Sequence, residues 1–384
     1  MSPLETTKAF INQNARISSN TVANIWEKFV GTGELNDMRL RPVIVDRWLK
    51  SRDLGINPLS TRAKSVISNS EIQNKLSSEN LGVSAKNVLD KMSDTISATG
   101  HVIVLADKSG RIIYSVGHQR TQSHLEKINF RPGGEWNENI VGPNGVGTPL
   151  TLGRPELILG SEHYCQGWQP WVCYGSPIHN PADRTVIGCV DITGPANKVC
   201  VEAMALAISI SQSIESDLSV IQYKKREELR LAYRNFQSKW PNNASFLVDK
   251  YGCIIDINAH AYSFLNEPVS MLNQPVQSFF PELISIIKQC VNDGMEKECE
   301  LELHQTYADP ARLLVKPYKK HREILGCFLM VIDKHRHKTI STSLQLNEDE
   351  LIKKALLKAG GNVSKAARML NIDRTTIYRR RKNW

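Results

Sequence analysis

The sequence lacks any run of 18 apolar residues, which is about the length that a helix needs to cross a bilayer. Its first residues, MSPLETTKAFINQNARI, also lack the apolar segment of a signal peptide. Apolar residues make up 41% of the chain and charged residues 23%, which is typical of a globular protein in water. We therefore predict a cytoplasmic protein without membrane contact, and 384 residues are enough for roughly two to four domains.

Paired cysteines are also absent. None of the eight cysteines belongs to a Cys-x-x-Cys pair, and the spacing of His163, Cys165 and Cys173 does not match a zinc site. In a chain without an export signal, scattered cysteines are typical of reduced and mostly buried thiols. We therefore predict no metal, no other cofactor and no catalytic residue. The cysteines are Cys165, Cys173, Cys189, Cys200, Cys253, Cys290, Cys299 and Cys327.

No Gly-Lys dipeptide occurs anywhere in the chain, so there is no Walker A loop of the kind that holds ATP phosphates. The glycine-rich stretch at residues 142–147, GPNGVG, lacks the required lysine and does not stand between a hydrophobic strand and a helix. We interpret its glycines as turn residues and not as a nucleotide site.

The C-terminal residues contain three short helical patterns in succession. Apolar residues recur at helical spacing in the first two patterns, and Gly360-Gly361 separates them. Asn362 is placed to cap the second helix and Asp373 to cap the third. We predict helices over residues 348–359, 362–370 and 374–382.

Basic residues are concentrated in the same segment. From Gly361 to Trp384 the chain has seven Lys and Arg residues against one Asp, and these account for most of its net charge of +9. Such a local excess of positive charge is typical of nucleic-acid binding. Small residues at Ala366 and Ala367 allow two helices to cross closely, as a helix-turn-helix requires.

The segment GGNVSKAARMLNIDRTTIYRRRK closely resembles the Fis-type helix-turn-helix that ends many bacterial enhancer-binding activators. The resemblance implies that the third helix lies in the major groove of double-stranded DNA. Arg381 stands where that family usually has leucine, and Trp384 can cover the arginine stem. The DNA-contacting residues that the resemblance implies are Ser364, Lys365, Arg374, Thr375, Thr376, Tyr378, Arg379, Arg380 and Lys382.

From His101 the apolar period changes from helical to alternating, which indicates strands. Two strand hairpins are predicted, in HVIVLADKSGRIIYSVG and in VCYGSPIHNPADRTVIGCVDITG, with a long excursion between them. This order resembles a GAF domain. The motifs GEW, GPNGVGT and EHY resemble the sensor of acetoin- and dihydroxyacetone (glycerol)-metabolism regulators, although Pro143 replaces the threonine common in that family. RPVIVDRWLKSRDLGINP resembles the helix that precedes this sensor.

The same resemblance implies a pocket for a small-molecule effector in the GAF domain. The polar residues Glu162, His163 and Tyr164 interrupt an otherwise apolar strand pair, so they are the best candidates for a pocket wall. For His163 the alternative is an ordinary interior histidine with its hydrogen bonds satisfied. The candidate ligand-binding residues are Trp136, Asn144, Glu162, His163, Tyr164 and Cys173.

Residues 197–239 contain neither proline nor glycine and carry one apolar seam, which predicts a single long helix. Its first half can pack on the sensor sheet. Its second half needs a partner, and we favour a parallel contact in a homodimer. The strands predicted after Pro241 resemble a PAS domain, which we interpret as a packing module.

Together these patterns predict an α+β multidomain protein. Its parts are a helical N-terminal region at residues 1–80, a GAF-like sensor at 81–215, a connecting helix at 216–240, a PAS-like domain at 241–335, a linker at 336–345 and the Fis-type segment at 346–384. The PAS-like segment stands where the enhancer-binding family has its ATPase. We therefore expect a sequence-specific transcriptional regulator of a catabolic operon that senses a metabolite without intrinsic ATPase activity.

Two other functions remain open at this point. The chain can be a non-catalytic partner of a full-length, ATPase-bearing relative. It can also be a reductase that uses the thiols of Cys165 and Cys173, as some GAF domains do.

Overall fold

The computed structural model describes residues 19–35, 37, 39–262, 268–301, 311–321, 323–332, 352, 355, 356, 359, 362–370, 374 and 377. The chain is a mixture of helices and antiparallel sheets, as predicted, and it divides into two compact units, Met1–Lys225 and Arg226–Trp384. Among the described residues, no helix has the length and apolar character needed to span a membrane.

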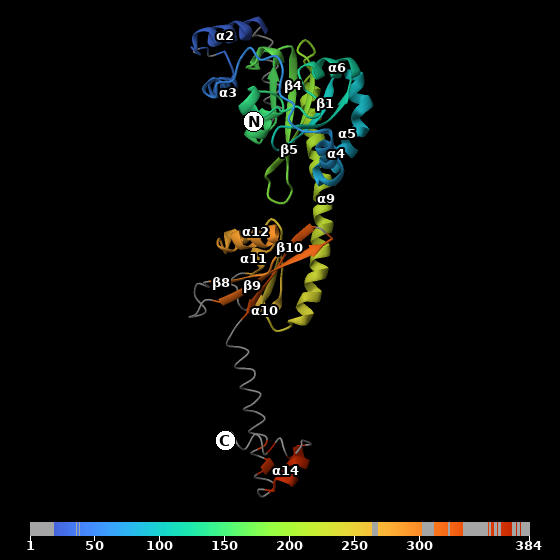
Figure 1. Cartoon of the computed structure of the whole chain (residues 1–384), viewed down its shortest axis with the longest axis vertical. Coiled ribbons are helices and arrows are strands. Elements are labelled where there is room, and N and C mark those ends of the chain that lie inside the picture. The colour runs from blue at the N-terminus through green and yellow to red at the C-terminus, as the bar shows by residue number, and fades with distance from the viewer. Residues whose placement is uncertain are drawn as a thin grey trace. The chain divides into compact units, whose positions relative to one another are not determined.

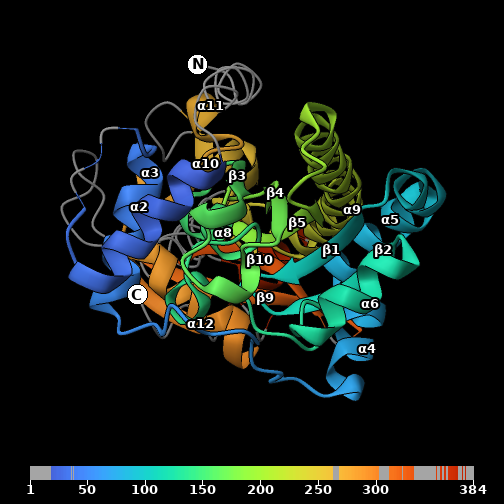
Figure 2. The ribbon, with the colours of Figure 1, turned by 90° about the horizontal axis from the view of Figure 1, so that it is seen from above.

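The first unit is built on a five-stranded antiparallel sheet with the order β2-β1-β5-β4-β3. Figure 2 shows these strands side by side, with α5 and α9 on one side of the sheet and α8 on the other. The elements are α2 (Ser19–Thr32), α3 (Pro42–Asp53), α4 (Asn69–Ser78), α5 (Asn80–Thr99), β1 (Val102–Asp107), β2 (Ile112–Gly117), α6 (Gln119–Lys127), α7 (Glu138–Val141), α8 (Gly147–Leu152), β3 (Glu156–Leu159), the 3-10 turns η1 (Gly160–Glu162) and η2 (Gln166–Trp168), β4 (Trp171–His179), β5 (Val186–Pro195) and α9 (Val201–Lys239).

Each face of this sheet carries its own apolar core. On one face, Ile103, Leu105 and Ile192 pack with residues of α5 and of the first half of α9. On the other face, Val102 and Val104 share a core with the N-terminal helices. Part of the helical region predicted before residue 80 therefore shares this core, through Ile25, Trp26, Phe29, Ile44 and Trp48.

The second unit contains another five-stranded antiparallel sheet, with the order β7-β6-β10-β9-β8. One face is covered by α12, which buries Leu283, Ile287 and Cys290. Figure 1 shows the elements of this unit in yellow, orange and red. They are β6 (Ser245–Asp249), β7 (Ile254–Ile257), α10 (Ala259–Tyr262), α11 (Pro268–Met271), η3 (Val276–Ser278), α12 (Leu283–Asp293), β8 (Lys297–Leu301), β9 (Ala311–Lys320) and β10 (Glu323–Ile332).

The other face of the second sheet is covered by the second half of α9. Leu229, Tyr233 and Phe236 are buried there against residues such as Leu247 and Phe328. The long helix is confirmed, but, contrary to our expectation, its second half does not need a second chain to cover these apolar residues. The apolar residues that α9 leaves exposed lie on a different face, at Val220, Tyr223 and Leu231.

In the C-terminal segment, the structure describes α14 (Val363–Leu370) and several single residues. Asn362 caps α14 as predicted, because its Oδ1 accepts a hydrogen bond of 3.1 Å from the Lys365 amide. A small apolar cluster contains Ile352, Ala355, Ala359, Ala366, Ala367 and Ile377. Each of the three predicted helices thus contributes buried residues to one core, which a compact three-helix domain requires.

Candidate effector site

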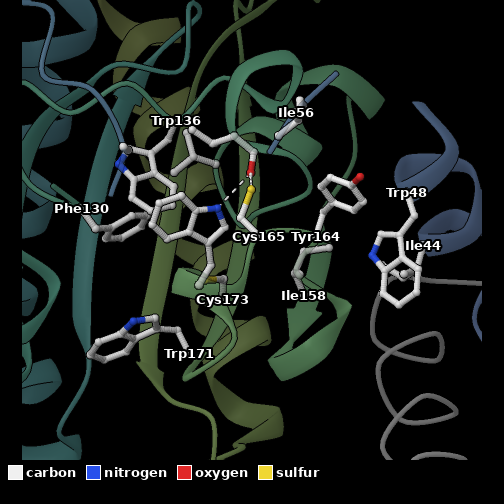
Figure 3. Close-up of a cluster of buried hydrophobic side chains, with 14 of the residues drawn as sticks. Ile44, Trp48, Ile56, Phe130, Trp136, Ile158, Tyr164, Cys165, Trp171 and Cys173 are labelled. Atoms are coloured by element: carbon white, nitrogen blue, oxygen red, sulfur yellow. Dashed lines mark hydrogen bonds between the residues drawn. The ribbon is translucent and has the colours of Figure 1, made fainter. Parts of the chain in front are cut away.

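The excursion between α6 and β4 covers one face of the first sheet with aromatic side chains. The ring centroid of Trp136 lies 4.5 Å from that of Phe130 (Figure 3) and 4.7 Å from that of Trp168. All three side chains are buried. Each indole N–H has a partner, since Trp136 donates to the Asn129 carbonyl at 3.0 Å and Trp168 donates to the Val141 carbonyl at 2.9 Å. Trp136, a predicted ligand residue, is therefore part of the packed core beneath the loops.

Asn144 organises the glycine-rich loop at residues 142–147. Its Oδ1 accepts from the amides of Val146 and Gly147, both at 2.9 Å, and its Nδ2 donates to the carbonyls of Trp136 and Gly142. All four hydrogen bonds that the Asn144 side chain can make, two donated and two accepted, are therefore made within the protein. This agrees with the prediction that the loop is a structural turn.

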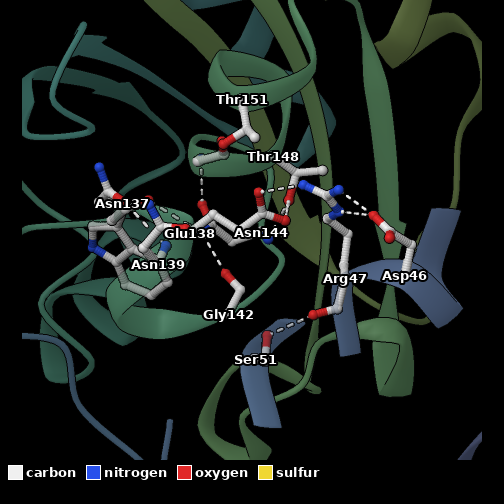
Figure 4. A network of polar contacts seen from close by, with 12 residues as sticks. Asp46, Arg47, Ser51, Asn137, Glu138, Asn139, Gly142, Asn144, Thr148 and Thr151 are labelled. Atoms are coloured by element: carbon white, nitrogen blue, oxygen red, sulfur yellow. Dashed lines mark hydrogen bonds and ion pairs between the residues drawn. The ribbon is translucent and has the colours of Figure 1, made fainter. Parts of the chain in front are cut away.

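The loop is tied to α3 by a buried polar chain (Figure 4). The Asn144 amide donates to Thr148 Oγ1 at 3.1 Å, and that hydroxyl donates to Glu138 Oε1 at 3.1 Å. Arg47 on α3 completes the chain, with its Nη1 at 3.3 Å from Glu138 Oε2. We call Arg47, Glu138, Thr148 and Asn144 the loop clasp.

A second link joins the start of α3 to the edge of the sheet. The guanidinium of Arg41 binds both oxygens of Glu162, at 2.9 and 2.8 Å, and reaches Glu156 Oε1 at 2.6 Å. The indole of Trp48 donates to the Glu162 carbonyl at 2.8 Å. Glu162 ends the 3-10 turn η1, so the interpretation that it interrupts a strand is wrong. Its carboxylate is occupied by an intramolecular ion pair.

His163 and Tyr164 follow η1 and are buried. His163 Nδ1 lies 2.9 Å from the Gly160 carbonyl, and because a carbonyl only accepts, Nδ1 carries the proton. Burial lowers the pKa of His163 to about 4, so the ring is neutral at physiological pH. The Tyr164 carbonyl accepts from the Trp26 indole at 2.8 Å. His163 is therefore the satisfied interior histidine of the alternative interpretation, with its Nε2 left as an acceptor.

Cys173 on β4 lies beside this histidine. Its Sγ is 3.5 Å from His163 Nε2, so the thiol is the donor. Burial, with a smaller effect from Asp191, raises the pKa of Cys173 well above its ordinary value, and burial raises the pKa of Cys165 to about 12. Because the thiolate is the nucleophile, neither residue is suited to thiol chemistry. Within the described parts of the chain, no group of three or more His, Cys, Asp or Glu side chains could hold a metal ion.

Four residues of this region were not predicted from the sequence. Arg41 precedes α3 and Arg47 lies in it, and only their distant partners give these two residues a role. Asp191 and Thr193 on β5 lie next to Cys173, in the register Cys173 opposite Thr193. A signal for these two was present, because the strand GCVDITG places an acid within an apolar run.

Of the predicted DNA-contacting residues, the structure describes Ser364 and Lys365 on α14 and also Arg374. Lys365 and Arg374 are exposed, and Ser364 is partly buried. The other predicted contacts, Thr375, Thr376, Tyr378, Arg379, Arg380 and Lys382, lie outside the described residues.

Two family descriptions match this chain. The one described as "MimR, N-terminal domain" matches residues 19–216, and the one described as "Bacterial regulatory protein, Fis family" matches residues 343–384. The first match covers just over half of the chain and coincides with α2 to the first part of α9.

Curated relatives resemble the same N-terminal part. The acetoin dehydrogenase operon transcriptional activator AcoR of Bacillus subtilis is 30% identical over 214 residues, which are 55% of this chain and 35% of that protein. The propane 2-monooxygenase operon transcriptional activator MimR of Mycolicibacterium smegmatis is 28% identical over 216 residues, 56% of this chain and 36% of that protein. The chain thus spans little more than a third of the length of these relatives.

Among solved structures, the complex of DhaR(N) with DhaL from E. coli aligns with a TM-score of 0.48 and 14% identity, over 76% of this chain and all of that one. The family match over residues 19–216 does not depend on this likeness. The chain belongs to the family of the MimR N-terminal domain, and it ends in a segment of the Fis family of bacterial regulatory proteins.

Proposed function

We propose that this protein is a cytoplasmic transcriptional regulator that binds double-stranded DNA and controls a catabolic operon in response to a small metabolite. The observation that carries the proposal is the presence of both family matches on one chain, a MimR-type N-terminal domain and a Fis-type segment. The two relatives named above are transcriptional activators of operons for acetoin and propane metabolism by their own descriptions.

The sensor in this proposal is a GAF-like domain built on the first sheet. The effector has to bind two arrangements of the protein with different affinity, because otherwise it shifts no equilibrium. The loop clasp and the Arg41 ion pair connect the loops over the sheet to α3, so α3 is the element that loop movement affects first. Trp136, Asn144, Glu162 and Tyr164 support these loops and do not contact the effector in our proposal.

The interval between the two matched segments, residues 217–342, contains the end of α9 and the second sheet. It contains no Gly-Lys dipeptide. We propose that the protein regulates transcription without hydrolysing ATP, and that the second unit is a PAS-like packing module.

The DNA-binding part of the proposal is tested with the full-length chain. A library of random-sequence duplexes, selected by binding, should converge on one sequence motif. Failure to enrich any motif would contradict sequence-specific binding.

The roles of individual residues in the Fis-type segment, base contact or phosphate contact, are tested on the selected duplex and on a scrambled one. Arg379→Ala should weaken binding to the selected duplex by roughly 1–3 kcal/mol and relax the preference at one base. Lys382→Ala should weaken binding to both duplexes alike and lower the salt dependence by about one unit of slope. Equal losses on both duplexes for Arg379→Ala would assign that residue to the phosphate backbone.

A further inference from the structure

The inner face of the first sheet carries polar groups at its centre, where an apolar core is expected. Cys173 on β4 and Asp191 and Thr193 on β5 are all buried there. The neighbouring residues on β1 are Val102, opposite Thr193, and Val104, opposite Asp191. Three polar side chains thus form one patch with apolar neighbours on the same face.

The hydrogen bonds of this patch leave one oxygen without a partner. The Thr193 hydroxyl donates to Asp191 Oδ2, and Cys173 Sγ lies 3.2 Å from the same hydroxyl. The fully buried Asp191 Oδ1 has no hydrogen-bond partner in the described part of the chain. Burial raises the pKa of Asp191 to about 7, although the Thr193 hydroxyl and the Tyr174 amide oppose this. An unsatisfied buried carboxyl oxygen is costly.

The second sheet shows that this fold does not need a polar group at this place. Gly188 pairs with Asp107 in the first sheet, and Gly326 pairs with Asp249 at the corresponding place in the second. Counted from these two glycines, Asp191 corresponds to Leu329. The remaining residues of the face also have apolar counterparts, since strand pairing matches Cys173, Gly175 and Thr193 with Leu313, Val315 and Val331.

The glycine-rich loop lies directly against the unpaired oxygen. A Cβ added at Gly145 would come within 2.1 Å of Asp191 Oδ1 and 2.5 Å of Cys173 Cβ. A Cβ at Gly175 would come within 1.8 Å of the Gly145 carbonyl oxygen. Both positions therefore require glycine for the loop to approach the sheet, and a molecule that approaches Asp191 Oδ1 from the loop side has to displace Gly145.

We propose that Asp191 is the anchor of the effector, and that the effector is a small uncharged molecule whose hydroxyl group donates a hydrogen bond to Oδ1 when it displaces Gly145. This rests on the proposed sensory function of the first unit. A hydroxyl group suits both protonation states of Asp191, because it donates to Oδ1 of the ionised carboxylate and can accept from the protonated one. Apolar neighbours such as Val104 suit a short carbon skeleton. A hydroxyl is favoured over an ammonium group because an ammonium ion would lose its hydration among these valines for a single carboxylate.

A displacement of Gly145 can also be transmitted to the rest of the unit. Gly145 follows Asn144, which holds the loop through its hydrogen bonds and begins the loop clasp to Arg47 on α3. Binding at Asp191 therefore strains or releases the clasp, and the effect reaches α3 without any direct contact between α3 and the effector.

The test measures the thermal unfolding midpoint and the dissociation constant of the full-length protein with isopropanol, propylene glycol and glycerol, beside isopropylamine. Asp191→Val removes the acceptor, and Asp191→Asn keeps an acceptor oxygen without the charge. Asp107→Asn is the matched control, because Asp107 is another buried aspartate of the same unit, at the end of β1.

At least one alcohol should raise the midpoint of the wild type and of Asp107→Asn. Asp191→Val should lose about 10- to 100-fold in affinity, and Asp191→Asn should lose less. If Asp191→Val does not fold, the test uses Asp191→Asn alone. An affinity of Asp191→Asn for the alcohol equal to that of the wild type then overturns the proposal. An unchanged affinity of Asp191→Val, a preference for isopropylamine, or no effect of any alcohol on the wild type also overturns it. Because these measurements need no DNA, a failure of DNA binding would refute the proposed regulator and leave this result separate.

Discussion

In both sheets the first two strands are joined by the same turn, Asp-Lys-x-Gly. Asp107 Oδ1 accepts from the amides of Ser109 and Arg111, and Asp249 Oδ1 accepts from the amides two and four residues later in the same way. Each aspartate also pairs with a cation from a preceding helix, Lys75 at 3.3 Å in the first unit and Arg226 at 2.7 Å in the second.

The sheets differ in what lies on the inner face of their central strand. The second has Leu329 in a closed apolar core, whereas the first has Asp191 beneath a glycine loop held by the clasp. Because strand order and turn are the same, the polar residues of the first sheet are not required by the architecture. The comparison therefore separates residues that this architecture requires from residues, such as Asp191, that it does not require.

The largest effect is expected when an aspartate is placed at the corresponding position of the second sheet. Leu329→Asp should cost at least about 4 kcal/mol of unfolding free energy, because the second sheet offers no hydroxyl like that of Thr193. Leu329→Val serves as the control and should cost about 1 kcal/mol. Urea unfolding of the full-length protein measures both, and similar costs would mean that the second sheet accepts a buried acid.

The ion pairs that attach helices to the two sheets should differ in importance. Arg41→Gln leaves Glu162 buried without its cation and Glu156 with only the more distant Arg154, and we expect a loss of about 3–5 kcal/mol. Arg226→Gln leaves only Asp249, which keeps its two backbone donors, and about 1–3 kcal/mol should be lost. The same unfolding experiment measures both variants. A larger loss for Arg226→Gln would contradict this ranking.

The buried acid should also give the first unit a pH dependence that the second sheet lacks. Because the pKa of Asp191 is raised from 3.8 to about 7, the folded chain holds a proton that the unfolded chain has lost between these values. Its contribution to the free energy of unfolding therefore falls as the pH rises through this window, by about 1.4 kcal/mol for each pH unit.

This effect is isolated by subtracting the unfolding free energy of the wild type from that of Asp191→Asn at each pH. His163, whose pKa is lowered to about 4, has the opposite effect between pH 4 and 6.5 and cancels in the difference. The stability of Asp191→Asn relative to the wild type should rise from pH 4 to 7 and then level off. A flat difference would mean that the carboxyl is not protonated in the folded chain.

The smallest effect concerns the homodimer contact that the sequence predicts along α9. The exposed Val220, Tyr223 and Leu231 lie on one face of α9, away from the buried Leu229 and Phe236. Leu231→Glu should weaken self-association about tenfold without changing the unfolding free energy by more than about 0.5 kcal/mol. Leu59→Glu, which places the same charge at an exposed apolar residue outside α9, is the control. Light scattering over a concentration series measures both, and equal masses would exclude this face as the dimer contact.

Much of the fold was predictable from local sequence. The alternation after His101, the Asp-Lys-x-Gly turns and the residues without proline or glycine before Pro241 predicted the hairpins and α9 correctly. The candidate site was predictable only in part. Asn144, His163 and Cys173 do lie near Asp191, but Trp136 and Glu162 belong to the packed core and to an ion pair.

The sequence by itself determined the secondary structure, the Asn362 cap and the family, because periodicity, turn residues and motifs act over a few neighbouring positions. Only the tertiary structure decided that α3 holds the sensor loops, since Arg41 and Glu162 are 121 positions apart. It also decided that the second half of α9 is occupied by its own sheet and that Asp191 keeps an oxygen without a partner. Such pairings depend on which surfaces meet when the chain packs, and no local pattern encodes the partner of a buried charge.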